Sequence, residues 1–397
     1  MALASLPLLM SLVIPVTRYG DASDYVMMAM SIGHDGDLTY DAVDLERVMA
    51  SRPPGTDYPA GMFLLRDSAG SLHVGGHSFY YPLLAVPFCL LLGFRGFGVL
   101  NGLLLGGSIV LVARSVSPEH RTGGWAWAVS GVCCSAAIDY TIWPMAETWL
   151  LFLSTAFICA YRRRAFWIAG GLLGLGAATH APMALWAALP AVDCLRRRIR
   201  PLDILVLGGC TLMMAAPQAV YNLRVSGVLH PAWLDLRTAS RFLYYPVAFP
   251  GQEQFDRASH TVTFTRFPRL GHISLRDVVA ALVSPKMGLV WFYPLVLLAA
   301  VRMWRERRGG ATLAAAGLVL VAFCTAGSLS SHQVGLRYLN PVYPAFLLGF
   351  QTFRWDRLER VLLVIGLLLG LTFVLFPRAN SSELISQKAV LTALLYR

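Results

Sequence analysis

The sequence has little charge for its length. Only 14% of its 397 residues are charged, whereas 56% are hydrophobic, and the mean hydropathy is +0.57. Soluble globular proteins have about 45–50% apolar and about 25% charged residues. This excess of apolar residues cannot be buried in one water-soluble core, so it excludes a cytosolic enzyme, a disordered chain and a secreted disulfide-rich domain. The composition predicts an all-α polytopic membrane protein.

The motifs of many soluble active sites are also missing. The seven cysteines lie in or beside apolar segments without a CxxC or CxxH spacing. The nine histidines show no HxH pattern, and their one HxxxH spacing, His73 to His77, encloses two glycines. Such spacings are the usual signatures of zinc and redox sites. No Walker loop, GxSxG elbow or HExxH motif occurs either. The sequence therefore predicts neither a disulfide framework nor a histidine-based metal centre.

Basic residues are plentiful but unevenly placed. The formal net charge is +11, yet Lys286 and Lys388 are the only lysines among 33 basic residues. Five short connections between apolar runs hold 16 arginines against six acidic residues, when the flanking Asp193 and Asp203 are counted. This pattern marks the cytoplasmic side of a membrane protein and does not indicate a nucleic-acid partner. The five connections cover residues 114–121, 162–164, 196–200, 302–308 and 354–360.

Apolar runs set the expected number of membrane spans. A helix needs about 20 apolar residues to cross the hydrocarbon core, and the runs predict about 10–11 transmembrane helices. The stretch 79–94 is expected to lie at the interface as a helix, because it is short and contains two prolines. The predicted spans cover 2–17, 96–113, 122–142, 147–161, 165–179 with 183–195, 202–222, 287–301, 311–328, 341–353 and 359–377.

The stretch 165–195 begins and ends at arginine clusters, so it is predicted to enter the membrane and return to the same side. Its turn is expected at residues 179–182. The glycines in 170–176 only superficially resemble a nucleotide-binding loop, because no strand precedes them. We interpret them as sites of close helix packing.

The remaining polar residues form two long segments, 18–79 and 223–286, which are predicted to share the outer face. The whole chain, 1–397, is expected to form one membrane domain. Residues 1–17 have no basic residue before their apolar run, so we interpret them as a retained first helix. A cleaved signal peptide is the alternative.

The candidate catalytic acids lie next to predicted spans. Asp21 and Asp24 open the first polar loop before an amphipathic helix, and Glu147 lies at the outer end of its span. A carboxylate in a water-poor cavity suits general-base work, because burial raises its pKa towards the operating range. Asp139 is placed similarly. The structural alternatives are a helix N-cap with an acid in the first turn for Asp21 and Asp24, and a favourable helix N-terminus for Glu147.

Three basic side chains lie apart from the cytoplasmic clusters. Lys286 and Arg337 are predicted where outer loops enter spans, and His180 at the tip of the hairpin. Ionisable groups at membrane depth are candidates for function, and arginine suits bidentate contact with a phosphate. The alternatives are side chains that reach towards lipid headgroups for Lys286 and Arg337, and a hydrogen-bonded turn residue for His180.

The order of these features resembles the GT-C superfamily of membrane glycosyltransferases. It is most similar to the bacterial and archaeal branch that includes relatives of protein O-mannosyltransferases and of lipid A aminoarabinose transferase. The likeness extends along nearly the whole chain. The residues that carry it are Gly20 to Tyr25, Ala29, Ser31, Asp35 to Leu38, His77 to Leu84 with Pro87, Asn101, Trp143-Pro144 with Glu147, Gly171 to Pro182, Tyr221-Asn222, Ser284 to Leu289 with Trp291 and Pro294, and Gly335 to Leu339 with Pro341 and Pro344.

The resemblance implies a GT-C-like bundle with a large first exoplasmic loop and interfacial helices. It also implies transfer of a hexose or pentose from a polyprenyl-phosphate donor to a hydroxyl of a glycan, lipid or protein. Asp21 matches the family's first-loop aspartate, although Ala22 replaces the second acid often found there, which leaves Asp24 as an alternative. His180 stands where the family usually has lysine or arginine, so Arg337, Lys286 and the adjacent Tyr338 are the preferred donor-phosphate residues.

The expected reaction is an inverting displacement at the outer face of a bacterial cytoplasmic membrane. Asp21 acts as the base, Glu147 positions the acceptor, and Arg337 and Lys286 stabilise the leaving lipid phosphate. No cofactor is certain; Mg²⁺ or Mn²⁺ between Asp21, Asp24 and Glu147 is an open alternative, because the superfamily has metal-dependent and metal-independent members. A transporter or lipid flippase is the rival function, although the sequence has no repeat of two halves.

Overall fold

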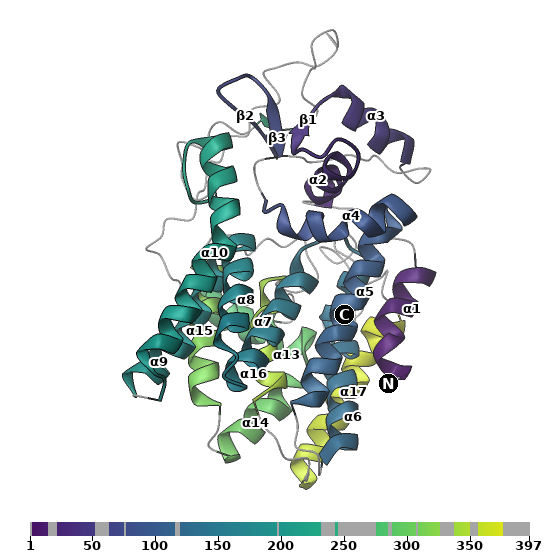
Figure 1. Cartoon of the computed structure of the whole chain (residues 1–397). Coiled ribbons are helices and arrows are strands. Elements are labelled where there is room, and N and C mark those ends of the chain that lie inside the picture. The colour runs from purple at the N-terminus through teal and green to yellow at the C-terminus, as the bar shows by residue number, and fades with distance from the viewer. Residues whose placement is uncertain are drawn as a thin grey trace.

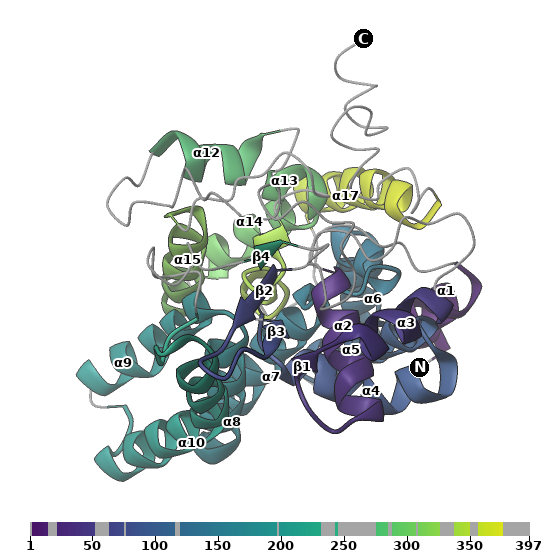
Figure 2. The same cartoon turned by 90° about the horizontal axis from the view of Figure 1, so that it is seen from above.

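The computed structural model shows a bundle of helices with a small mixed cap at one end (Figure 1). Seen from above, α7 (Glu147–Arg162) lies between two groups of helices (Figure 2). One group contains α8 (Phe166–Thr179), α10 (Pro201–Ser226) and α15 (Gly310–Thr325), and the other contains α1 (Leu6–Val13), α5 (Arg95–Arg114) and α6 (Arg121–Cys133). The structure describes residues 2–14, 22–51, 63–74, 77–115, 120–196, 198–231, 243–244, 275–284, 288–306, 309–325, 337–349 and 356–375.

Most predicted spans are found as helices. The bundle consists of η1 (Ala2–Ser5), α1 (Leu6–Val13), α5 (Arg95–Arg114), α6 (Arg121–Cys133), α7 (Glu147–Arg162), α8 (Phe166–Thr179), α9 (Ala188–Leu195), α10 (Pro201–Ser226), α14 (Val296–Glu306), α15 (Gly310–Thr325) and α17 (Arg357–Leu375). The predicted interfacial stretch forms α4 (Tyr80–Leu92).

Three predicted spans are wrong as continuous helices. The 122–142 span is broken after α6, and the chain continues in a 3-10 helix, η3 (Ala136–Thr141). The 287–301 span is divided into α13 (Leu289–Phe292) and α14, and a proline at 294 lies at the break.

In the described part of the 341–353 span, which ends at residue 349, the only helix is α16 (Pro344–Leu347), and it follows a short 3-10 helix, η7 (Arg337–Leu339). Proline lacks a backbone donor and clashes with the preceding turn, so prolines at these positions shorten the helices.

The predicted hairpin is confirmed at its turn. α8 ends at Thr179, and a 3-10 helix, η4 (Ala181–Ala187), follows and continues into α9. The predicted role of the glycines is also confirmed, because α8 packs against α10. A Cβ atom at Gly170 would collide with the carbonyl oxygen of Leu207, and one at Gly174 with that of Thr211. Small residues four positions apart therefore let the two backbones approach closely.

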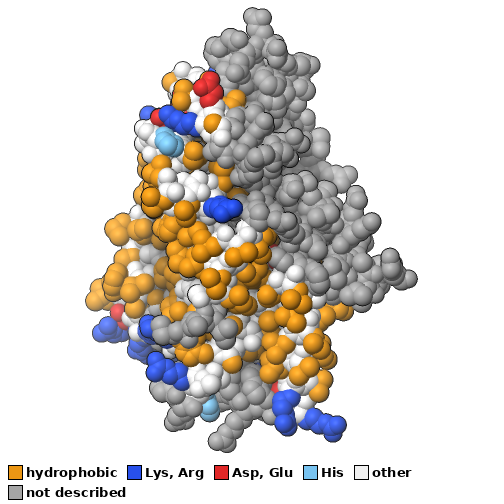
Figure 3. All heavy atoms as spheres, turned by 90° about the vertical axis from the view of Figure 1, so that its right-hand side faces the viewer, with side chains coloured by type: hydrophobic (Ala, Val, Ile, Leu, Met, Phe, Trp, Pro, Cys, Tyr) orange, Lys and Arg blue, Asp and Glu red, His pale blue; other side chains and the backbone are white. Residues whose placement is uncertain are grey.

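The outer surface of the bundle suits a lipid environment. Among the described helices, α5, α10 and α17 are long and apolar enough to cross a membrane, judged by length and composition. Large side chains such as Leu205, Leu212 and Leu368 are exposed on α10 and α17. On the face shown in Figure 3, hydrophobic side chains form a broad band, and arginine side chains gather at its lower edge. The chain is an integral membrane protein.

The first polar segment folds into a cap above the bundle (Figure 1). It contains α2 (Ala22–His34), β1 (Thr39–Tyr40), α3 (Ala42–Ser51), β2 (Phe63–Arg66) and β3 (Leu72–Val74). The helix predicted to be amphipathic is instead buried along its first ten residues, from Ala22 to Ser31. The strands were not predicted, because two to four residues carry too little pattern to show a period of two.

The sheet joins the two long polar segments. β4 (Leu243–Tyr244) belongs to the second segment and pairs with β2, which gives the antiparallel order β1-β3-β2-β4. The register sets Leu64 opposite Val74 and Leu243 opposite Leu64 on the other side. The described remainder of the second segment includes α12 (Leu275–Val283). The paired strands of the two long segments therefore lie at the same end of the bundle.

Candidate functional site

The site is built around the first residue of α7. Glu147 begins this helix, directly after the Trp143-Pro144 turn, and only 3% of the residue is exposed. A carboxylate at this position is favoured by the partial positive charge of the helix N-terminus. The opposite end of α7 carries Arg162, which donates to the carbonyl oxygen of Leu348. A helix of this length separates Glu147 from the arginine-rich end by roughly 24 Å.

Arg337 contacts Glu147 from a distant part of the chain. Its Nε lies 3.5 Å from Glu147 Oε1, and one terminal nitrogen donates to the Tyr338 hydroxyl at 2.9 Å. The guanidinium carbon also lies 4.9 Å from the centre of the Tyr338 ring. The Arg337 side chain is 12% exposed. The hydrogen bond and the cation–π contact with Tyr338, together with the ion pair with Glu147, thus hold the mostly buried Arg337 guanidinium in one orientation.

An aromatic stack connects this pair to the hairpin turn. The rings of Phe323 and Tyr338 are stacked with centres 4.7 Å apart, and the His180 ring lies 5.4 Å from Phe323 and 5.6 Å from Tyr338. Trp149 Nε1 donates to Thr179 Oγ1 at 3.2 Å, which fixes the end of α8 against α7. The structure therefore brings four of the predicted residues together, namely Glu147, Arg337, Tyr338 and His180.

The first loop contributes a second group of polar residues. Asp24, in the first turn of α2, is completely buried, and its Oδ2 lies 3.2 Å from His77 Nε2. His77 Nδ1 lies 3.4 Å from the Tyr25 hydroxyl, and the two rings are 4.8 Å apart. His77 precedes α4, so one imidazole connects α2 to the segment that enters the bundle. Asp24 is thus a buried, paired carboxylate.

A chain of aromatic and polar contacts links the two groups. The Tyr25 ring meets Tyr81 edge to face at 5.2 Å, and the Tyr81 hydroxyl donates to Asn101 Oδ1 at 2.9 Å. The same oxygen accepts from Thr148, the neighbour of Glu147. Glu147 also interacts electrostatically with the Tyr81 hydroxyl. The first-loop acids and the Glu147–Arg337 pair are therefore parts of one connected region.

Asn101 is the centre of this connection. Besides accepting from Tyr81 and Thr148, its side-chain nitrogen donates to the carbonyl oxygens of Tyr140 and Trp143, both at 2.8 Å. Every hydrogen-bonding group of the amide is satisfied in a fully buried position. This arrangement fixes the turn that precedes Glu147.

Asp139 lies close to the same region without joining it by hydrogen bonds. Within the described residues, neither of its carboxylate oxygens has a hydrogen-bond partner, and only 2% of the residue is exposed. It interacts electrostatically with Tyr140 and Tyr293. The Tyr293 hydroxyl donates to Asn340 Oδ1 at 2.8 Å. Asp139 is therefore a residue of η3 that is buried in the packed interior.

Two predicted residues, Asp21 and Lys286, lie outside the described residues. Sequence reasoning included His77 in the family resemblance without giving it a role, and it did not single out Phe323, although both contact predicted residues. A histidine in a polar loop does not show which side chain it contacts, and Phe323 looks like any apolar residue of a span. Among the described residues, no group of three or more histidine, cysteine or acidic side chains could hold a metal ion.

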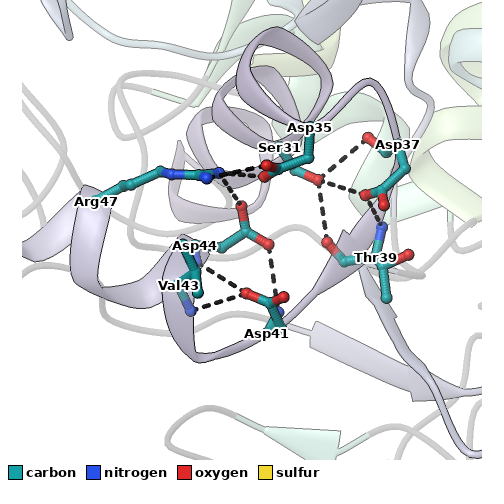
Figure 4. A network of polar contacts seen from close by, with 8 residues as sticks. All are labelled: Ser31, Asp35, Asp37, Thr39, Asp41, Val43, Asp44 and Arg47. Carbon is teal, nitrogen blue, oxygen red and sulfur yellow. Dashed lines mark hydrogen bonds and ion pairs between the residues drawn. The ribbon is translucent and has the colours of Figure 1, made fainter.

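A second acidic network lies farther out in the cap (Figure 4). Asp41 caps α3 by accepting from the backbone nitrogens of Val43 and Asp44, at 2.8 and 3.1 Å, and Asp44 accepts from the Asp41 nitrogen in return. This is a capping box. Arg47 pairs with Asp35 and lies 3.6 Å from Asp44 Oδ1. Burial raises the pKa of Asp44 from 3.8 to about 7.

Comparison with known proteins identifies the fold. No protein-family profile matches the sequence, and no curated protein does so significantly. The crystal structure of ArnT from Cupriavidus metallidurans bound to undecaprenyl phosphate is similar, with a TM-score of 0.53 and 13% sequence identity. The similar region covers 94% of this chain, which spans 59% of the ArnT chain. The chain therefore has a fold similar to that of ArnT, and the GT-C-like bundle that the sequence resemblance implied is confirmed.

Proposed function

We propose that the chain transfers a sugar from a polyprenyl-phosphate donor to an acceptor hydroxyl at the outer face of the cytoplasmic membrane. The observation that carries the proposal is the connected region that links Asp24 to the Glu147–Arg337 pair inside an ArnT-like fold. It combines first-loop carboxylates with a held guanidinium at one end of the bundle. The opposite end of α7 carries the arginines typical of a cytoplasmic side.

Arg337 is proposed to bind the donor phosphate. Its guanidinium is a planar cation held by Glu147 and Tyr338, and a planar guanidinium suits bidentate contact with the oxygens of a phosphate. Glu147 then serves to hold Arg337 in place, and Lys286 is a second proposed cation for the phosphate. Polyprenyl phosphate is also the ligand class named for ArnT.

Asp21 is the proposed base of an inverting displacement. It removes the proton of the acceptor hydroxyl while that oxygen forms a bond to the anomeric carbon. The bond from this carbon to the phosphate oxygen breaks at the same time, and the lipid phosphate leaves with its charge stabilised by Arg337. In the sequence, Asp21 immediately precedes α2 and stands three positions before the buried Asp24.

The test is turnover in detergent, where no compartments exist and transport has no meaning. The purified protein is incubated with a panel of hexose and pentose polyprenyl phosphates together with glycan, lipid and peptide acceptors that carry hydroxyl groups, and release of polyprenyl phosphate is measured. We expect Asp21→Asn to abolish release while the protein stays folded, and Asp67→Asn, a first-loop acid paired with His73, to retain it. No release by the wild-type protein from any donor would reject the enzyme. Full release by Asp21→Asn would remove Asp21 from the mechanism.

A further inference from the structure

The first turn of α2 holds a carboxylate that is too buried to touch a substrate itself. Asp24 has no exposed surface, and its Oδ2 lies 3.2 Å from His77 Nε2. A buried carboxylate is costly unless it is hydrogen-bonded or paired with a charge. The partner is a histidine from outside the helix, so the contact constrains α2 relative to the segment that begins α4.

His77 contacts this turn through both ring nitrogens. A neutral imidazole has one donor and one acceptor nitrogen. The Nε2 of His77 lies 3.2 Å from Asp24 Oδ2, at ion-pair distance, and its Nδ1 is hydrogen-bonded to the Tyr25 hydroxyl 3.4 Å away. Asp24 and Tyr25 are neighbours on α2, and Tyr25 also packs against Tyr81 of α4. One side chain thus fixes both the rotation and the position of the helix start.

We propose that His77 is a positioning residue that aligns the first turn of α2 for proton transfer. The inference rests on the proposed function, in which Asp21 is the base, because Asp21 directly precedes this turn in the sequence. His77 takes no proton in the reaction; it acts by its close polar contact with Asp24. The nearby His73 has different partners, since its Nε2 lies 3.0 Å from Asp67 and its Nδ1 faces the carbonyl oxygen of Leu38.

Two amide substitutions of His77 separate its contact with Asp24 from other effects. The side-chain nitrogen of glutamine can reach the place of the imidazole Nε2, whereas asparagine is one methylene shorter and cannot reach Asp24. We therefore expect His77→Gln to keep most of the wild-type kcat. His77→Asn should lose about 10²-fold in kcat, the usual effect of a misplacement of about 1 Å. KM for the donor should stay the same in both, because Arg337 binds the phosphate elsewhere. His73→Asn is the matched control and should keep full activity.

Equal kcat values for His77→Gln and His77→Asn would overturn the inference, as would a loss confined to KM. A separate measurement covers the case in which no donor is turned over, which would reject the proposed function. Thermal unfolding of Asp24→Asn, His77→Asn and the double variant forms a cycle that does not depend on activity. We expect the double variant to be clearly less destabilised than the sum of the single variants. Additive effects would show that the two residues do not act together and would refute the positioning role.

Discussion

Replacing Arg337 by methionine tests both the stability and the function of the Glu147–Arg337 pair. Glu147 is 3% exposed, and its Oε1 lies 3.5 Å from Arg337 Nε. Breaking a buried ion pair from one side typically costs about 3–5 kcal/mol, because the remaining charge is left in a poorly solvated place. The Tyr338 ring would also lose a cation contact of about 0.5–1 kcal/mol. We expect Arg337→Met to lower the unfolding temperature strongly and to abolish transfer.

The double variant Glu147→Gln/Arg337→Met separates the two effects. Removing the carboxylate charge relieves most of the destabilisation, so the unfolding temperature should recover. Transfer should not recover, because the donor phosphate still lacks its cation. Arg337→Lys keeps the charge but not the planar fork, and it should be intermediate in both measurements. The assays are thermal unfolding in detergent and release of polyprenyl phosphate. An Arg337→Met protein as stable as the wild type would refute the buried pair, and turnover by the double variant would refute phosphate binding.

Two further predictions concern the cap and the bundle. Because burial raises the pKa of Asp44 from 3.8 to about 7, the stability contributed by its protonated form is present at low pH and lost as the pH rises towards 7. The unfolding temperature of the wild type should therefore fall between about pH 4 and about pH 7 relative to that of Asp44→Asn; parallel curves would contradict this. Gly174→Ala should destabilise the protein by about 1–3 kcal/mol in thermal unfolding, because its Cβ would meet the Thr211 carbonyl oxygen. Gly171→Ala, whose Cβ would have its nearest neighbour 3.7 Å away, is the control and should be tolerated; equal losses would refute the packing argument.

The membrane architecture could be predicted because the bilayer imposes strong rules on a sequence. Long apolar runs and arginine clusters are large signals, and they located α5, α7, α10 and α17 within a few residues. The hairpin turn followed from sidedness alone, since both ends of 165–195 are arginine-rich. Hydropathy does not, however, report where a run is broken. The interruptions at η3, at Pro294 and around α16 arise from local backbone chemistry and tertiary packing, which a hydropathy average over many residues conceals.

The candidate site shows a different limit. Arg337 stood out because a cation away from the cytoplasmic clusters is unusual, and Glu147 because it lies at a span end. Neither signal says that the two side chains meet, since 190 positions separate them and only the three-dimensional packing of η7 against the start of α7 brings them together.

His77 belongs to the family resemblance, but no sequence pattern indicated its role, because that role depends on the side chains that it contacts. A histidine in a loop looks the same whether it is solvated or bridges Asp24 and Tyr25. Residues that act through charge can thus be found from a membrane sequence, because charge is rare there. Residues that act by holding another side chain can be identified only from the three-dimensional structure. If His77 positions α2 as proposed, the functional residues of this fold form two classes. The charged residues can be identified from the sequence, whereas the residues that align them can be identified only from the packed structure.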